Sequence, residues 1–421
     1  MPRNFLNWVD RDSRIITIVR GIRTLGQAAI TLLLALYLSA LGFSLIRIGV
    51  VLSIDVAGTF FLALLVALIG NRYGRRHLLA IIMFLAAVAS LGMALTRSFP
   101  VILVAIFFGS FTAGAGAGGP LQPLEVSSIA EVSPADRRTR LMGIMFIVGT
   151  AAAAFGALLI ALPTFTQQLF HLDKITSFRL VFILYALIQL VSAFLYLRLS
   201  SLVEAKVTKR KWNNPFKLKS RKRIFTLTAL FAADGFGGAL VGQSLVALWF
   251  STKFGLNLNS LSLVFFFSSL LSAASTWVSV RIAECIGLLK TMVFTHIPSS
   301  LFLIAAAFSP FAWMAISLYQ LRSVLSQMDV PARESYTMAV VEPDERVAMA
   351  GIGGVGRSGA SVIGPAAGTA LWNALGASAP FVGCGIFKVS YDLLIYTMFR
   401  KVKPPEEEKR ISERSKEEET D

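Results

Sequence analysis

Ionisable side chains interrupt several long apolar stretches of this sequence, and these residues are the ones that could do chemistry. In the first stretch Arg20, Arg23 and Gln27 are spaced three and four residues apart, so they share one face of a helix. Arg20 lies close enough to the start of the stretch for its side chain to reach water, whereas Arg23 lies deeper. We predict that Arg23 and Gln27 bind a polar substrate.

Two aspartates, Asp55 and Asp234, lie near the middle of other apolar stretches. Burial disfavours the charged form of a carboxylate, which lets the group exchange protons near neutral pH. Both are therefore candidates for carrying protons, and Asp234 is also a candidate for contacting a substrate. A structural ion pair with one of the arginines is the alternative, and a pair that breaks on protonation would combine the two roles.

Further charges lie in the last three apolar stretches. Arg322 is near the centre of one, seven residues before Asp329, and Arg357 is about ten residues into the next. We predict that both arginines contact substrate, with bonds from Arg357 to backbone carbonyls as the alternative. Lys388 and Asp392 are four residues apart and can neutralise each other on one helix. With that pair set aside, arginines outnumber aspartates, which favours a substrate with some anionic character.

The composition indicates a membrane protein. Mean hydropathy is +0.68, and only 15% of residues are charged, against about 25% in soluble domains. Runs of 18 or more apolar residues can cross about 30 Å of hydrocarbon as helix. The net charge of +16 resides mainly in loops and tails, so we predict no nucleic-acid binding.

We predict an all-α polytopic membrane protein with twelve transmembrane helices. The spans cover residues 15–38, 46–69, 78–95, 100–124, 141–163, 180–197, 224–250, 261–280, 291–308, 311–329, 347–372 and 379–399. With both termini in the cytoplasm, most of the 40 Lys and Arg residues fall on the cytoplasmic side. The expected location is the plasma membrane.

A repeated pattern indicates two pseudo-symmetric six-helix halves. Glu, eight residues, Pro, two residues and Arg occur at Glu125 to Arg137 and again at Glu334 to Arg346. A looser repeat relates Gly74 to Gly287. The predicted divisions are an amino-terminal half 1–199, a basic cytoplasmic linker 200–222, a carboxy-terminal half 223–399 and a disordered charged tail 400–421. Such repeats are typical of secondary transporters, whose site lies near the bilayer midplane.

The turn between the second and third spans carries a family signature. Residues 67–76, ALIGNRYGRR, resemble motif A of the major facilitator superfamily, although Ala67 replaces its first Gly and Asn71 its Asp. The resemblance implies that helices 1, 4, 7 and 10 line a central cavity and that helices 3, 6, 9 and 12 are peripheral. It also implies that the turn is part of a cytoplasmic gate. The predicted gate residues are Asn71, Arg72, Gly74, Arg75, Arg76, Glu125, Arg137, Glu334 and Arg346.

Two glycine-rich stretches have both a packing and a functional interpretation. Gly351, Ala360, Gly364-Pro365 and Gly368 resemble the superfamily's antiporter motif, but close helix packing explains such residues as well. The stretch 114–120 lacks the Lys-Ser/Thr of a phosphate-binding loop, so we interpret it as a packing or hinge segment.

We therefore predict a secondary active transporter of a small solute, working by alternating access and coupled to protons. Export of a small organic compound is preferred on the glycine-rich motif, and uptake of an organic or inorganic anion is the alternative. A polytopic membrane enzyme or a lipid-moving protein is the alternative of a different class. The three histidines have no metal-ligand spacing, so no metal, cofactor or enzymatic activity is predicted. The expected partners are the solute, protons and the lipid bilayer, and the expected functional form is a monomer.

Overall fold

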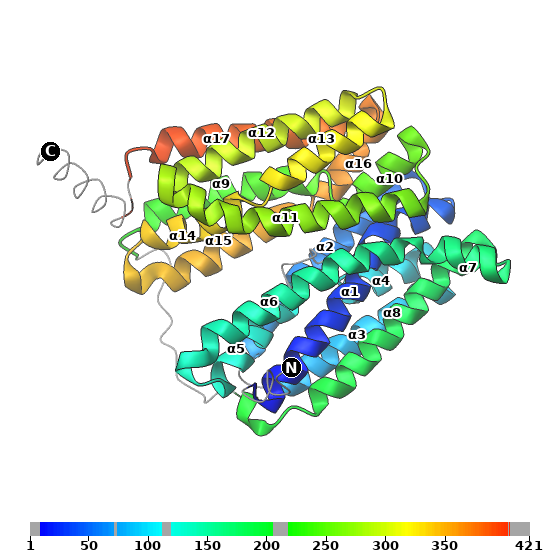
Figure 1. Ribbon diagram of the computed structural model, residues 1–421, viewed down its shortest axis with the longest axis horizontal. Helices are drawn as coiled ribbons and strands as arrows, with labels where there is room; N and C mark the ends of the chain where they lie inside the picture. The colour runs from blue at the N-terminus through cyan, green and yellow to red at the C-terminus, as the bar shows by residue number, and fades with distance from the viewer. Residues whose placement is uncertain (1–8, 71–73, 112–118, 205–217, 403, 405–421) are drawn as a thin grey trace, which may run out of the picture. The chain divides into compact units, whose positions relative to one another are not determined.

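The computed structural model describes residues 9–70, 74–111, 119–204, 218–402 and 404, and within them every regular element is a helix (Figure 1). The chain divides into two compact units. Unit 1 comprises Met1–Lys209 and Gly242–Ser269, and unit 2 comprises Arg210–Val241 and Leu270–Asp421.

Unit 1 contains nine complete α-helices among its described residues and the first part of a tenth, α11 (Leu258–Ile286). The nine are α1 (Arg11–Ala40), α2 (Leu45–Ile69), α3 (Arg75–Leu95), α4 (Phe99–Gly109), α5 (Gln122–Val132), α6 (Ala135–Leu158), α7 (Leu162–Phe170), α8 (Lys174–Leu197) and α10 (Gln243–Phe254). Short 3₁₀ turns lie at η1 (Gly119–Leu121), η2 (Leu159–Ala161) and η3 (Ser201–Val203).

Unit 2 contains the rest of α11 and seven further helices in the described part of the chain. These are α9 (Arg221–Ala239), α12 (Leu288–Phe308), α13 (Ala312–Leu325), α14 (Asp329–Ala339), α15 (Arg346–Ser361), α16 (Gly364–Leu375) and α17 (Ala379–Phe399). One 3₁₀ turn, η5 (Pro343–Glu345), precedes α15.

Nine helical stretches among the described residues are long and apolar enough to cross a membrane. They coincide with the predicted spans one to three, five to nine and twelve. The other three predicted spans are interrupted helices. Ser110 takes a left-handed conformation (φ 48°) after α4, a short turn separates α13 from α14, and α15 stops before Gly364-Pro365, where proline lacks the N–H that a helix needs.

The packing within the two units repeats. In unit 1, α3 packs along α8, and α1 packs along α6 and α8. In unit 2, α12 packs along α17, and α9 packs along α15 and α17. The corresponding helices α3 and α12 also begin alike, since Gly74 (φ 83°) and Gly287 (φ 90°) precede them in a conformation that favours glycine. The predicted internal repeat therefore extends to local geometry.

Large apolar side chains on the outer faces of the helices remain exposed. Leu95 of unit 1 and Trp277, Trp313 and Leu375 of unit 2 each expose more than two thirds of their surface. Soluble proteins rarely expose apolar patches of this kind, whereas lipid tails solvate them. The surface is that of a protein embedded in a bilayer.

Candidate functional site

In unit 1, a buried carboxylate on α5 binds two arginines of α1. Arg20 Nη1 lies 2.7 Å from Glu125 Oε2, and Arg23 Nη2 lies 3.0 Å from Glu125 Oε1. The hydroxyl of Tyr196 on α8 donates to the same Oε1 at 2.8 Å. All four side chains are almost wholly buried. Glu125, predicted as a gate residue, thus lies at the centre of a buried charge cluster with a positive excess.

Arg23 also connects the Glu125 cluster to the break in the helix after α4. Arg23 Nη1 donates to Gln27 Oε1 at 3.2 Å, and Gln27 Nε2 donates to the carbonyl of Ser110 at 3.0 Å. Asp55 on α2 accepts the backbone N–H of Phe111 at 2.7 Å. Buried backbone groups released by a helix break need such partners. Gln27 and Asp55 therefore support the irregular backbone, in addition to the substrate and proton roles predicted for them.

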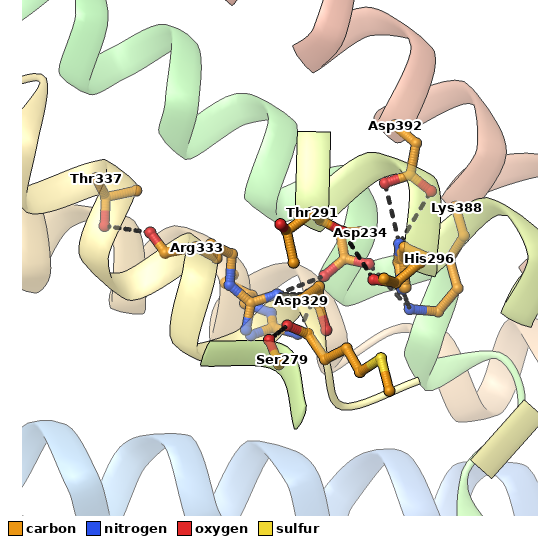
Figure 2. Close-up of polar contacts among 12 residues, drawn as sticks. Asp234, Ser279, Thr291, His296, Asp329, Arg333, Thr337, Lys388 and Asp392 are labelled. Carbon is orange, nitrogen blue, oxygen red and sulfur yellow. Dashed lines mark hydrogen bonds and ion pairs between the residues drawn. The ribbon is translucent and has the colours of Figure 1, made fainter. Parts of the chain in front are cut away.

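In unit 2, Asp234 on α9 is surrounded by cations from three other helices. Its Oδ1 lies 3.0 Å from Lys388 Nζ, and its Oδ2 lies 3.7 Å from Arg333 Nη1 (Figure 2). The same Oδ2 lies 3.0 Å from Arg357 Nη2. Gly235 permits the approach, because a Cβ there would lie 2.6 Å from the backbone oxygen of Arg357. The structure thus brings the predicted residues Asp234 and Arg357 together.

The buried cluster continues through Arg333 to α14. Arg333 Nη1 lies 2.7 Å from Asp329 Oδ2, four residues earlier on the helix. Asp329 lies seven residues after Arg322, but its ion-pair partner is Arg333. The predicted site residue Arg322 is half-buried, with its guanidinium 5.5 Å from the ring centre of Tyr319. Among the described residues it has no ion-pair partner.

A histidine that sequence analysis left without a role completes the cluster. His296 Nδ1 on α12 lies 3.0 Å from both carboxylate oxygens of Asp392, and its Nε2 lies 3.1 Å from Lys388 Nζ (Figure 2). The predicted mutual neutralisation of Lys388 and Asp392 is wrong, because each binds a residue of another helix. The signal that could have revealed His296 was its position inside the predicted span 291–308.

The two units carry opposite charges at corresponding places. In unit 1, α1 provides the arginines and α5 the carboxylate. In unit 2, α9 provides the carboxylate Asp234, and Arg333 of α14 is one of its cations. Helix α1 corresponds to α9 in its packing. Both units therefore have a buried ion pair, but the cation lies on the first helix in unit 1 and the carboxylate lies on the corresponding helix in unit 2.

The turn before α3 is held by a residue outside the predicted gate. The backbone N–H of Arg75 donates to Glu204 Oε2 at 2.5 Å, and Arg76 Nε lies 3.7 Å from Glu204 Oε1. The Arg75 guanidinium donates to the carbonyls of Val203 and Ser127 at 3.0 and 3.1 Å. Glu204 therefore places a carboxylate at the amino-terminal end of α3.

The remaining predicted gate residues are either exposed or outside the described part of the chain. Asn71 and Arg72 fall outside the described residues. Arg137, Glu334 and Arg346 are exposed, and Arg346 Nε donates to the carbonyl of Met338 at 2.9 Å.

Glu345, next to Arg346 in sequence, caps the start of α9. Its carboxylate accepts the N–H groups of Lys219 and Ser220 at 2.5 and 2.9 Å, just before α9.

The described residues contain no group of three or more His, Cys, Asp or Glu side chains that could hold a metal ion.

One of the two glycine-rich segments lies where helices pack closely. Cβ atoms at Gly364 and Gly368 would collide with Ala239 and Leu240 at the end of α9, so close helix packing explains both glycines. Residues 114–118 of the other segment lie outside the described residues.

Membrane-spanning helices in a repeated arrangement, with buried ion pairs in each repeat, are typical of polytopic transport proteins. A sequence model described as Major Facilitator Superfamily matches residues 16–319 and 227–420. The chain belongs to the Major Facilitator Superfamily, which confirms the resemblance and the twelve-span fold class.

Individual relatives are distant. An uncharacterized membrane protein of Saccharomyces cerevisiae, YJR124C, is 22% identical over 92% of this chain and 94% of its own. A bacterial homolog of the human lysosomal transporter Spinster, in an inward-facing and occupied conformation, has 16% identity and a TM-score of 0.71 over 95% and 98% of the two chains. The nucleoside transporter NupG has 13% identity and a TM-score of 0.74 over 93% and 99%. At these identities the solved structures support the fold alone.

Proposed function

We propose that this protein is a proton-coupled secondary transporter of a small organic solute, working by alternating access. The observation that carries the proposal is the Asp234 cluster of unit 2. It combines fully buried charges with one cation, Arg357, whose side chain is 40% exposed. A buried charge network that ends in an accessible cation suits a site where solute and proton binding influence each other.

Proton coupling is supported by the concentration of titratable groups. Asp234, Asp392 and His296 are all at least nine-tenths buried and within one set of contacts. Asp55 remains a second predicted proton carrier, but its hydrogen bond to the backbone of Phe111 favours a structural role.

Export of a small organic compound is the first candidate direction, from the resemblance of the segment 351–368 to the antiporter motif. Uptake of an anion is the second candidate, and a specific observation favours it. Arg322 has no ion-pair partner among the described residues, and Arg357 is the most exposed cation of its cluster. Two accessible guanidinium groups suit a carboxylate or phosphate.

The proposal includes location in the plasma membrane with both termini in the cytoplasm, function as a monomer, and no enzymatic activity or cofactor. Cys285 is exposed and Cys384 is buried, which provides a test of orientation. Cys285 lies close to the predicted cytoplasmic end of α11. Labelling of Cys285 by an impermeant maleimide in inverted vesicles, but not in right-side-out vesicles, would support this orientation, and the reverse would contradict it.

The function can be tested with purified protein. Thermal-shift screening against metabolites and drugs would select solutes, including lactate, succinate, glutamate and the cationic lipophile ethidium. Each hit is then assayed in proteoliposomes with an imposed pH gradient. Transport that collapses with the gradient supports proton coupling, and transport that ignores it refutes the coupling. Anionic hits that are lost in Arg322→Gln support anion uptake, whereas cationic lipophiles as the only hits would exclude it.

A further inference from the structure

A continuous chain of polar contacts links three helices of unit 2. It runs from Asp234 on α9 to Lys388 on α17, from Lys388 to His296 on α12, and from His296 to Asp392 on α17 (Figure 2). The successive distances are 3.0, 3.1 and 3.0 Å. His296 and Asp392 expose 4% and 1% of their side chains, so water competes little for these contacts.

The donors and acceptors along this chain define the state of the imidazole. A lysine ammonium has donors only, so His296 Nε2 must accept from Lys388. The remaining ring nitrogen, Nδ1, then carries the hydrogen and donates to Asp392. The geometry therefore corresponds to a neutral His296 with its proton on Nδ1.

The charges around His296 balance in this state. The helices packed against α12 are α13, α14 and α17. Together with α9, they carry Lys388, Asp392, Arg322, Asp329, Arg333 and Asp234 in this region, and the exposed Glu334 on α14. The ring of Tyr391 on α17 lies edge-on to the imidazole, with 6.2 Å between the ring centres. Within the connected cluster, the cations Arg333, Arg357 and Lys388 match the carboxylates Asp234, Asp329 and Asp392 one for one.

We infer that His296 is the proton-binding switch of this cluster, and the inference rests on the proposed function. A hydronium ion gives its proton to the lone pair of Nε2, so one N–H bond forms, one O–H bond breaks and a water molecule is left. Nε2 then becomes a donor that faces the ammonium of Lys388, so their hydrogen bond is lost and the two charges repel. Asp392 compensates the imidazolium through both of its oxygens, while Lys388 keeps Asp234 as its remaining partner.

The switch also points to the charge of the solute. Protonation changes the cluster from balanced to one net positive charge in a buried region, which is unfavourable without a counter-ion. Arg357 is the member that can receive one, because its side chain is 40% exposed. Its 3.0 Å contact with Asp234 Oδ2 is an ion pair without hydrogen-bond geometry. An anionic solute would therefore bind together with the proton.

Nitrogen-15 NMR of the full-length protein in nanodiscs, labelled at histidine, tests the switch without a known solute. The variant His296→Asn assigns the signal, and the exposed His77 and His171 serve as references. As the medium is changed from alkaline to mildly acidic, His296 must change from the Nδ1–H tautomer to the doubly protonated ring for the inference to hold. A His296 that stays in one form across this range, or is the Nε2–H tautomer at high pH, would overturn the inference.

Two variants separate a switch from a structural histidine. Asp392→Asn keeps an acceptor for Nδ1–H but removes the charge, so less imidazolium is expected at any given pH. Lys388→Met removes the opposing cation, so more imidazolium is expected. Opposite changes support the switch, and equal titration in both variants and the wild type contradicts it. If Asp392→Asn does not fold, Lys388→Met alone decides.

Transport distinguishes this inference from the proposed function. If succinate uptake driven by a pH gradient persists unchanged in His296→Asn, the switch is refuted and proton coupling stands. If His296 titrates as expected but no solute responds to the gradient in the wild type, the coupling is refuted and the switch stands. His171→Asn is the matched control, because His171 is exposed and has a left-handed backbone (φ 52°) that asparagine also tolerates.

Discussion

Lys388 Nζ lies 3.0 Å from Asp234 Oδ1, although these residues are 154 positions apart and Asp392 is only four positions from Lys388. The ammonium also contacts His296 at 3.1 Å. Lys388 thus forms polar contacts from the last helix, α17, to both α9 and α12. In the superfamily pattern this helix is peripheral, so a polar connection from it to Asp234 indicates more than packing.

The first prediction concerns the charge balance between Lys388 and Asp234. Lys388→Met leaves a buried carboxylate excess, and removal of one partner of a buried ion pair costs about 3–5 kcal/mol. Because Arg357 and Arg333 still contact Asp234, we expect the lower end, about 3 kcal/mol. The double variant with Asp234→Asn restores the balance and should recover part of this loss. The measurement is unfolding in mixed micelles.

Lys290→Met is the matched control for Lys388→Met, because Lys290 is exposed at the start of α12. It should leave the free energy of unfolding nearly unchanged. Additive losses in the Lys388 and Asp234 double variant would contradict a direct pair.

The second prediction concerns Glu125 in unit 1. Tyr196→Phe removes a hydrogen bond to a charged group, which is worth about 1.5–3 kcal/mol. Tyr185→Phe is the control, since the Tyr185 hydroxyl accepts from the neutral Gln189 amide at 2.9 Å and should cost about 0.5–1.5 kcal/mol. Chemical unfolding of the two variants compares them, and an equal or larger loss in Tyr185→Phe would refute the charged hydrogen bond.

The third prediction concerns the turn before α3. Glu204 accepts the first N–H of the helix and lies near Arg76, so Glu204→Ala should cost about 1 kcal/mol, as loss of a helix cap does. Glu131→Ala removes only a 3.8 Å contact of a partly exposed carboxylate and should cost less than about 0.5 kcal/mol. Hydrogen exchange at the start of α3 should rise in the first variant alone, and equal protection in both would count against the cap.

The fourth prediction concerns pH. Desolvation acts to raise the pKa of Glu345, but hydrogen bonds from Ser220 and Lys219 outweigh it and hold the pKa below its ordinary value. The native state therefore prefers the ionised form. This stabilisation is present above the unfolded pKa, about 4.3, and disappears as the pH falls through the lower folded pKa. The stability difference between wild type and Glu345→Gln should be full at neutral pH and vanish in acid, and a difference that grows in acid would contradict this sign.

Much of the fold follows from hydrophobic length alone. The predicted span 379–399 has the same bounds as α17, and 46–69 differs from α2 by one residue. The break after α4 could not be predicted in this way. Hydropathy does not register the left-handed Ser110, and Gln27 and Asp55, which stabilise the break, come from two other helices.

The residue types in the sequence indicated which charged side chains belong to the candidate site, but not which residues they pair with. Charges inside apolar spans drew attention to Arg23, Asp234 and Arg357, and the structure places all three in buried or partly buried clusters. Spacing on one helix misassigned Lys388, because pairing across helices depends on how the helices pack. Glu204 was missed because it lies in the predicted linker, where a carboxylate is unremarkable in sequence.

Proton movement into proteoliposomes is the direct test of proton coupling. Vesicles that contain the protein and a trapped pH indicator are supplied with a solute selected by thermal shift, with succinate as the first anion. We predict a solute-dependent change in internal pH for wild type and for Lys290→Met, and none for Asp234→Asn. Solute transport by the wild type without any proton movement, or an undiminished pH change in Asp234→Asn, would contradict it.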